Sequence, residues 1–105
     1  ERLLKLAQGT DLWLHAKDMP GSHVIVSLQG REISDAALLQ AAKLAAWYSR
    51  GQGAAVPVNY TLRKYVKKPS GAPAGFVTFT GEKMLLVTAA EADIRAMRQQ
   101  EGETA

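Results

Sequence analysis

Residues 11–26 constrain the fold more than any other part of the chain. Apolar and polar residues alternate over residues 11–17, a period of two that is typical of a half-buried β-strand. A turn is predicted at Pro20-Gly21, because proline fixes φ and glycine accepts the positive φ of a type II turn. The alternation resumes at Val24, so the sequence predicts a strand, a turn and a second strand. The first strand should direct Leu12, Leu14 and Ala16 to the core and Asp11, Trp13, His15 and Lys17 to the other face.

The side chains on that second face are unusual for a structural hairpin. This unit contains both histidines of the chain, His15 and His23, and one of its two tryptophans, Trp13. A half-buried hairpin does not need so many aromatic and polar side chains on its outer face. We therefore treat this face as a candidate functional surface.

The length and composition exclude several classes of protein. A chain of 105 residues has the size of one domain with a single core. It contains no cysteine, which excludes a disulfide framework and a thiolate metal site. No apolar run approaches the roughly 20 residues of a membrane helix, and residues 1–6 lack the basic start and apolar block of a signal peptide. We expect a cytoplasmic protein with no membrane segment.

The clearest helix is predicted over residues 34–50. Ser34 can accept a hydrogen bond from the first free backbone N–H groups, and Gly51 is a plausible C-cap residue. Apolar residues recur at helical spacing, which defines a core-facing stripe of Leu38, Ala41, Ala42, Ala45 and Tyr48. The small alanine side chains would let this helix lie close to a sheet.

Three further strands and two shorter helical segments complete the prediction. Residues 56–62 alternate as a strand, with Pro57 expected at a strand start or on an edge because it donates no ladder bond. Residues 76–80 and 84–88 should form a hairpin around Gly81. Helical patterns cover residues 2–7 and 89–100. The predicted class is α+β: a mainly antiparallel sheet of about five strands packed by the 34–50 helix, plus a C-terminal helix.

Positive charge is concentrated in one segment. The formal net charge of the chain is +3, while residues 60–83 alone carry +4. The charged residues of this segment are Arg63, Lys64, Lys67, Lys68 and Lys83 against Glu82. Lysine and arginine neutralise phosphates, and tyrosines such as Tyr60 and Tyr65 can stack on unpaired bases. The segment therefore favours a polyanionic ligand, and a merely solvated loop is the alternative.

Arrangements typical of enzymes are absent. His15 and His23 with Asp11 or Asp18 have the residue types of a zinc site but not its spacing. Ser22 and His23 are neighbours in sequence and lack the pattern of a nucleophile site. We therefore expect no catalytic, metal or cofactor site and no enzymatic activity.

Four segments together resemble one known family. Residues 11–24 read DLWLHAKDMPGSHV, and this order is similar to the signature of the NFACT-R domain, also called DUF814. Three later segments agree in order: AAKLAAWYS (41–49), VPVNYTL (56–62) and VKKPSGA (66–72). The resemblance covers about residues 1–88.

The resemblance implies a function. Proteins with this domain include the RqcH family, once described as fibronectin-binding proteins. They bind large ribosomal subunits obstructed by a stalled nascent chain and recruit alanyl-tRNA for C-terminal tailing. The domain would be their RNA-binding module, with tRNA and large-subunit RNA as partners. An adhesin-type, fibronectin-binding interaction domain is the alternative.

Two features depart from the family pattern. Asn59 stands where the family leads us to expect aspartate, and a family strand that precedes residue 1 is absent. We expect residues 1–105 to be a single domain, part of a longer protein. An open sheet edge would favour a dimer.

The candidate residues fall into two sets. The resemblance and the charge pattern together assign RNA contact to Trp13, His15, Lys17, Ser22, His23, Tyr60, Arg63, Lys64, Lys67, Lys68, Ser70 and Gly71. The residues expected to form the turn are Asp11, Asp18, Pro20 and Gly21.

Overall fold

The computed structural model confirms the α+β class. It describes residues 8–73 and 76–104, with side chains of the last helix described as far as Met97, so the predicted helical turn at 2–7 lies outside the described residues. The elements are β1 (Leu12–Ala16), β2 (Val24–Val26), α2 (Asp35–Trp47), β3 (Ala55–Leu62), η1 (Arg63–Tyr65), β4 (Val66–Lys67), β5 (Thr78–Phe79), β6 (Lys83–Thr88) and α3 (Glu91–Thr104).

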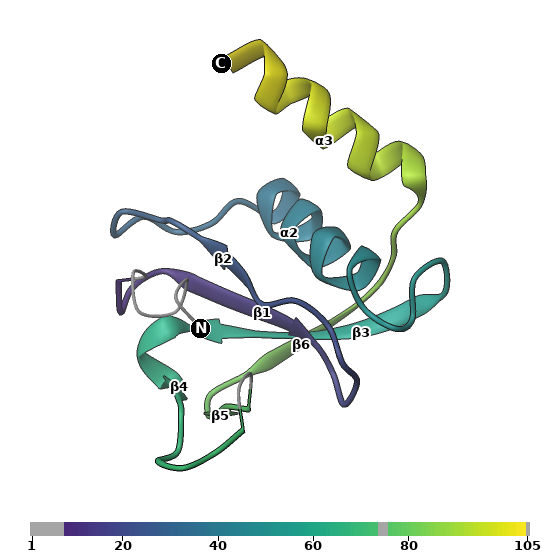
Figure 1. Cartoon of the computed structure of the whole chain (residues 1–105). Coiled ribbons are helices and arrows are strands. Elements are labelled where there is room, and N and C mark those ends of the chain that lie inside the picture. The colour runs from purple at the N-terminus through teal and green to yellow at the C-terminus, as the bar shows by residue number, and fades with distance from the viewer. Residues whose placement is uncertain (1–7, 74–75, 105) are drawn as a thin grey trace.

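Four strands form one antiparallel sheet in the order β2-β1-β3-β6, and β4 pairs with β5 in a separate two-stranded ribbon. Helix α2 lies over one face of the sheet, here called the core face, and α3 lies beyond α2 (Figure 1). The ribbon lies on the opposite, outer face (Figure 1). Within the described residues, neither helix is long and apolar enough to cross a membrane.

The core forms where α2 approaches the sheet. Strand β1 directs Leu12, Leu14 and Ala16 to this core, as the alternation predicted. Val56 and Val58 of β3 join them and are fully buried. The buried residues of α2 are all alanines: Ala41, Ala42, Ala45 and Ala46. Because an alanine methyl is small, the helix backbone lies close to the strands, and larger side chains would not fit there.

Pro57 has no backbone N–H group, and its position in β3 accommodates this. Pro57 lies one residue beyond the register that joins β3 to β1, which runs from Val58 onward. The Pro57 carbonyl accepts a 2.8 Å hydrogen bond from the Lys17 N–H, so the proline nitrogen also points to the β1 side. No bond to β6 is lost, so the proline is tolerated near the start of β3. The edge alternative of the prediction is wrong, because β3 lies between β1 and β6.

The predicted hairpin over residues 76–88 is wrong. Gly81 does adopt a positive φ of 66°, but β5 pairs with β4 and not with β6. The Thr80 N–H donates to the Tyr65 carbonyl, and the Thr61 hydroxyl donates to the Thr80 carbonyl. These bonds direct β5 onto the outer face, so the described residues form six strands in two sheets where about five were expected.

The turn between β1 and β2 also differs from the prediction. Asp18 adopts the positive φ, 55°, and Gly21 does not. Gly21 instead forms an isolated bridge with Ser49, where a Cβ atom would lie 3.3 Å from the Ser49 backbone. The glycine is therefore needed for close approach to the end of α2.

The helix boundaries shift slightly. Ser34 caps α2 as predicted, since its Oγ accepts from the Ala37 N–H at 3.1 Å. The helix ends at Trp47 rather than residue 50. The Ser49 hydroxyl donates to the Ala46 carbonyl at 2.6 Å, which satisfies a C-terminal carbonyl and turns the chain away.

An ion pair joins α3 to α2. Lys43 Nζ lies 3.2 Å from Asp93 Oδ1, and Asp93 Oδ2 accepts a hydrogen bond from the Ala90 N–H at the start of α3. The Ala90 bond, and then the Lys43 ammonium, hold the pKa of the Asp93 carboxyl below its ordinary value.

The first prediction concerns the alanine face of α2. Ala45→Leu should destabilise the domain by about 1–3 kcal/mol, because three added heavy atoms have no space against the sheet. Ala36→Leu, on the exposed side of the same helix, is the matched control. Urea unfolding of both variants measures the difference, and equal stabilities would contradict this packing.

The second prediction concerns pH. Because the Asp93 pKa is lowered in the folded state, the stabilisation by its charged form is complete at neutral pH. This stabilisation is lost progressively as the pH falls from about 4, the ordinary pKa of aspartate, through the lowered pKa of Asp93. NMR shifts of α3 amides should report loosening from α2 in acid. Asp93→Asn should remove this pH dependence, and an unchanged titration in the variant would refute the assignment.

Candidate nucleic-acid interface

One projecting structure carries a cluster of positive charge that no acidic residue offsets. We call η1, β4, β5 and the loop between the two strands the basic arm; its described residues are 63–73 and 76–80. Residues 63–80 contain four cations, Arg63, Lys64, Lys67 and Lys68, and no acidic residue. In Figure 1 the arm lies on the outer face of the sheet, on the side away from α2 and α3.

Trp13 fixes the arm to the sheet. Its side chain is only 1% exposed and packs with Val66 of β4. Its ring centroid lies 4.9 Å from that of Phe79 in β5. Ile25 and Val77 complete this second cluster. A buried indole shared by both strands of the ribbon therefore holds the arm against β1.

The two histidines surround the same indole. Trp13 Nε1 donates a 2.8 Å hydrogen bond to His23 Nδ1, so that nitrogen of His23 carries no proton. The His15 ring lies parallel to the indole, with 3° between the planes and 6.0 Å between centroids. Trp13 thus joins the arm to the segment that carries both histidines.

His15 closes the loop that follows β1. Its Nδ1 lies 2.7 Å from the Ala16 carbonyl oxygen and its Nε2 lies 3.2 Å from that of Gly21. Because a carbonyl oxygen only accepts, a neutral ring makes one of these bonds and a doubly protonated ring makes both. His15 is half-exposed, while Lys17 and Ser22 of the same loop are exposed.

The cations of the arm have different environments. Lys67 and Lys68 are exposed, and Lys64 Nζ lies 5.2 Å from the centre of the Tyr65 ring. Arg63 Nη1 donates to the Val66 carbonyl at 2.8 Å, so this side chain also braces the arm. The exposed lysines are therefore the cations of the arm that are accessible from solvent.

Ser70 and Gly71 lie in a tight turn at the end of the arm. The Ala72 N–H donates to the Pro69 carbonyl at 3.2 Å, and Gly71 adopts a φ of 77°. Both residues are exposed. The turn sets the path of the chain just after Lys67 and Lys68.

Two predicted RNA contacts are corrected by their positions. Trp13 was expected to stack on a base, but its indole is covered by the arm and offers no free ring face. Tyr60 packs against the core beneath α2, on the face of the sheet away from the arm. Neither side chain is available to a ligand on the outer face.

Asp11 is structural, as expected, but not at the expected turn. Its buried carboxylate accepts hydrogen bonds from the N–H groups of Gln8 at 2.8 Å and Leu28 at 3.2 Å. Its carbonyl accepts from the Arg63 N–H at 2.8 Å. Asp11 therefore joins the start of β1 to the end of β2 and to the base of the arm.

The Pro20 carbonyl accepts a hydrogen bond from the Arg50 N–H at 3.2 Å, so Pro20 links the loop between β1 and β2 to the end of α2.

The sequence interpretation identified Tyr65 as a possible base-stacking residue of the arm but missed Phe76. Tyr65 is 42% exposed beside Lys64, and Phe76 is exposed at the start of the return path to β5. Alternation over residues 76–80 would have placed Phe76 opposite in face to Val77 and Phe79. The alternation therefore indicated the face that Phe76 occupies. The incorrect pairing of residues 76–80 with residues 84–88 prevented this use of it.

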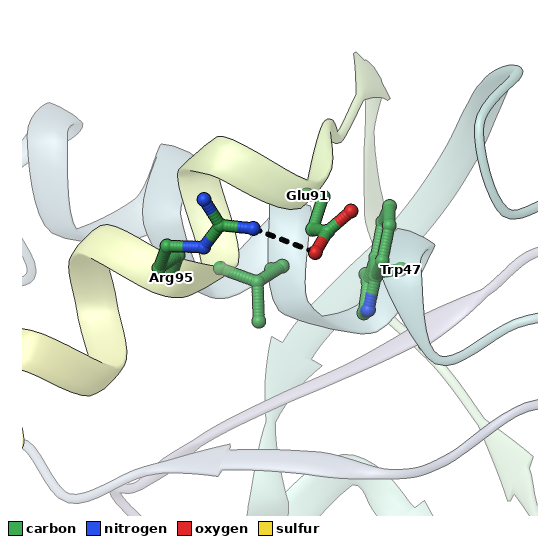
Figure 2. Close-up of a pocket in the computed structure, with 4 residues that line it drawn as sticks. Trp47, Glu91 and Arg95 are labelled. Carbon is green, nitrogen blue, oxygen red and sulfur yellow. Dashed lines mark hydrogen bonds and ion pairs between the residues drawn. The ribbon is translucent and has the colours of Figure 1, made fainter.

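A separate hollow between the helices has no comparable chemistry. Trp47, Glu91, Ile94 and Arg95 line about 150 Å³ at the seam between α2 and α3. Figure 2 shows the Trp47 ring beside the Glu91–Arg95 pair, which is an exposed pair one helical turn apart with a 2.8 Å contact. Among the described residues, no group of three or more potential metal ligands occurs. The basic arm is therefore the candidate site.

Known proteins resemble this chain in sequence and in fold. No family model matches the chain. The protein named Rqc2 homolog RqcH from Bacillus subtilis (strain 168) is 41% identical over 85 residues, which cover 80% of this chain. Its counterpart from Streptococcus pneumoniae (strain D39) is 43% identical over 100 residues, or 94% of this chain.

A solved structure gives the same result in three dimensions. The C-terminal part of the fibronectin/fibrinogen-binding protein from Streptococcus suis superposes with a TM-score of 0.85 and 40% identity, covering 90% of this chain. The chain is an NFACT-R-like domain. This NFACT-R-like domain spans only 15–18% of the RqcH relatives and 39% of the solved chain.

The third prediction tests the anchoring role of Trp13 in the NFACT-R-like domain. Trp13→Ala should cost about 3–5 kcal/mol of stability, because it empties the cluster under the arm. Trp13→Phe keeps a ring there and loses the bond to His23, which should cost about 1 kcal/mol. Urea unfolding measures both.

Trp47 provides the control, because it is half-buried at the seam between the helices. Trp47→Ala should be less destabilising than Trp13→Ala. Equal effects would show that the cluster does not anchor the arm.

Proposed function

We propose that this chain is an RNA-binding module of a ribosome quality-control factor of the RqcH type, and not an enzyme. The observation that carries the proposal is the basic arm: four cations and no acidic residue on one projecting ribbon. RNA phosphates are neutralised by lysine and arginine side chains, whichever bases are present. Similarity to RqcH proteins over most of the chain supports the same class.

The arm suits an extended RNA backbone. Lys67 and Lys68 are adjacent in sequence and exposed beside the tight turn at Ser70 and Gly71. The exposed Tyr65 ring offers a stacking surface for an unpaired base, a contact that is worth about 1–3 kcal/mol. Because Trp13 fixes the ribbon to β1, little conformational entropy is lost when these groups meet RNA.

The loop after β1 extends this surface. Lys17 and Ser22 are exposed there, and His15 and His23 lie between the loop and the indole that holds the arm. We assign these four residues to the same RNA-binding face. Arg63, Lys64, Ser70 and Gly71 complete the set on the arm itself.

The resemblance to the family supplies the finer proposal. The RNA would be tRNA and the RNA of an obstructed large ribosomal subunit, in the cytoplasm. The whole protein would recruit alanyl-tRNA for C-terminal tailing of the stalled chain. No cofactor is needed for such a binding role.

A second candidate function is an interaction with an extracellular-matrix protein. It is favoured by the Streptococcus suis relative, whose structure is described as that of a fibronectin/fibrinogen-binding protein. A protein partner recognised through apolar contacts would bind with little salt dependence, whereas phosphate contacts give a steep one.

The fourth prediction separates these functions. Fluorescence anisotropy with labelled tRNA and a scrambled hairpin RNA, across a salt series, should give binding that weakens steeply with salt. Lys67→Ala should weaken binding to both RNAs and lower the salt slope by about one unit. The control is Arg95→Ala on α3, which lies on the far side of the sheet (Figure 1) and should change neither quantity.

Other outcomes would redirect the proposal. An unchanged slope in Lys67→Ala would remove Lys67 from the interface. The absence of RNA binding at low salt, together with salt-insensitive binding to fibronectin, would favour the second function.

A further inference from the structure

The two edges of the four-stranded sheet are very different. Strand β2 forms one edge and is only three residues long. Strand β6 forms the other edge with six residues, and it exposes 53% of Met84 and 61% of Leu86. The run from Met84 to Ala90 contains no charged residue. Natural edge strands are usually protected by short length, charge, proline or a bulge, and β6 has only one of these, the exposed Lys83 at its first residue.

The hydrogen-bond pattern identifies the backbone groups at this edge. The Pro57 carbonyl accepts from Lys17, so the odd-numbered residues of β3 direct their backbone groups toward β1. The even-numbered residues of β3 therefore bond to β6, where their partners are Lys83, Leu85 and Val87. Alternation along the strand leaves the N–H and C=O groups of Met84, Leu86 and Thr88 directed away from the sheet.

We propose that β6 pairs in antiparallel fashion with β6 of a second copy of this chain, about a two-fold axis at Leu86. In this register Leu86 lies opposite Leu86 of the second copy, and Met84 lies opposite Thr88. These are the three residues whose backbone groups point outward, so each opposing pair exchanges two hydrogen bonds. The joined sheet has eight strands.

The side chains are compatible with this symmetric pairing. Residues directly opposite in an antiparallel pair lie on the same face, so the exposed Met84 and Leu86 side chains of both copies meet on the outer face. Lys83 lies opposite Ala89 of the second copy, and no two like charges are opposed. A second copy supplies both the missing backbone partners and an apolar cover.

The expected contact is small and reversible. One pair of six-residue strands buries less than the roughly 1,200 Å² of a standard interface, which corresponds to a weak, dissociable dimer. The two-fold axis is perpendicular to the sheet, so both basic arms lie on the same side of the joined sheet. The pairing does not rest on the proposed RNA-binding function.

The fifth prediction is an association equilibrium. Sedimentation velocity of the wild-type chain should pass from the monomer to the dimer mass between about 5 and 500 µM, the range suited to a small interface. Leu86→Lys places two like charges opposite each other at the axis, and should weaken association about tenfold or more. Met84→Lys provides a second probe of the same edge.

Two controls make the test specific. Leu39→Lys changes a leucine of α2 that is 41% exposed, and should leave the dimer intact. Mixing Leu86→Lys with Leu86→Glu should restore a dimer, because opposite charges then meet at the axis. Circular dichroism confirms that each variant is folded.

The remaining outcomes overturn the proposal. A wild-type chain that is monomeric throughout this range would mean that no second copy occupies the edge. A dimer that persists in both Leu86→Lys and Met84→Lys would place the contact elsewhere on the molecule.

Discussion

The burial of β1 on both faces is the constraint on which the rest of this structure depends. On one side Leu14 packs into the core under α2, and on the other Trp13 is enclosed by Val66 and Phe79. Helix α2 contributes side chains only to the first cluster and the ribbon only to the second, whereas β1 contributes buried side chains to both and the edge strand β2 adds partly buried ones to each. The apolar surface buried on the second face drives the ribbon against the sheet. The position of the cationic arm therefore follows from an aromatic residue that carries no charge.

Polar contacts then fix the details that burial leaves open. The Asp11 carboxylate satisfies two backbone N–H groups from separate segments. The bond from Trp13 to His23 satisfies an indole N–H that is otherwise buried. Because an unpaired buried donor is costly, these partners select one arrangement of the loops among several that would bury a similar apolar area. Packing sets the layers and hydrogen bonds set the register between them.

The sequence predicted elements whose signals are local. Ser34 and the alanine stripe identified α2, and the alternation from Leu12 to Ala16 gave the correct core face. It also gave the correct side for Trp13, but alternation reports only which face a residue occupies and not what covers that face. The ribbon that buries Trp13 is formed more than 50 residues later in the chain. Long-range pairing was therefore the part that a local pattern did not contain.

The same limit explains the errors at the turn and the hairpin. Gly21 was chosen for its freedom of φ, but its role is a close approach to Ser49, a contact made by a distant helix end. Thr78–Phe79 was assigned to its nearest neighbour in sequence, whereas Phe79 packs on Trp13. The candidate RNA contacts were identified from charge and resemblance. In the structure the Trp13 and Tyr60 side chains are not available for RNA contact. RNA contact by the exposed lysines stays a prediction.

The shortness of β4 and β5 has a consequence for the motions of the domain. Two paired residues on each strand supply few ladder bonds, so the ribbon depends on its cluster with Trp13. Such a unit can open while the four-stranded sheet and α2 stay folded. Amide hydrogen exchange in the ribbon then measures local opening, and exchange in β1 and β3 measures global unfolding. The molecule thus combines a rigid platform with an attachment of lower local stability, and this attachment is the basic arm itself.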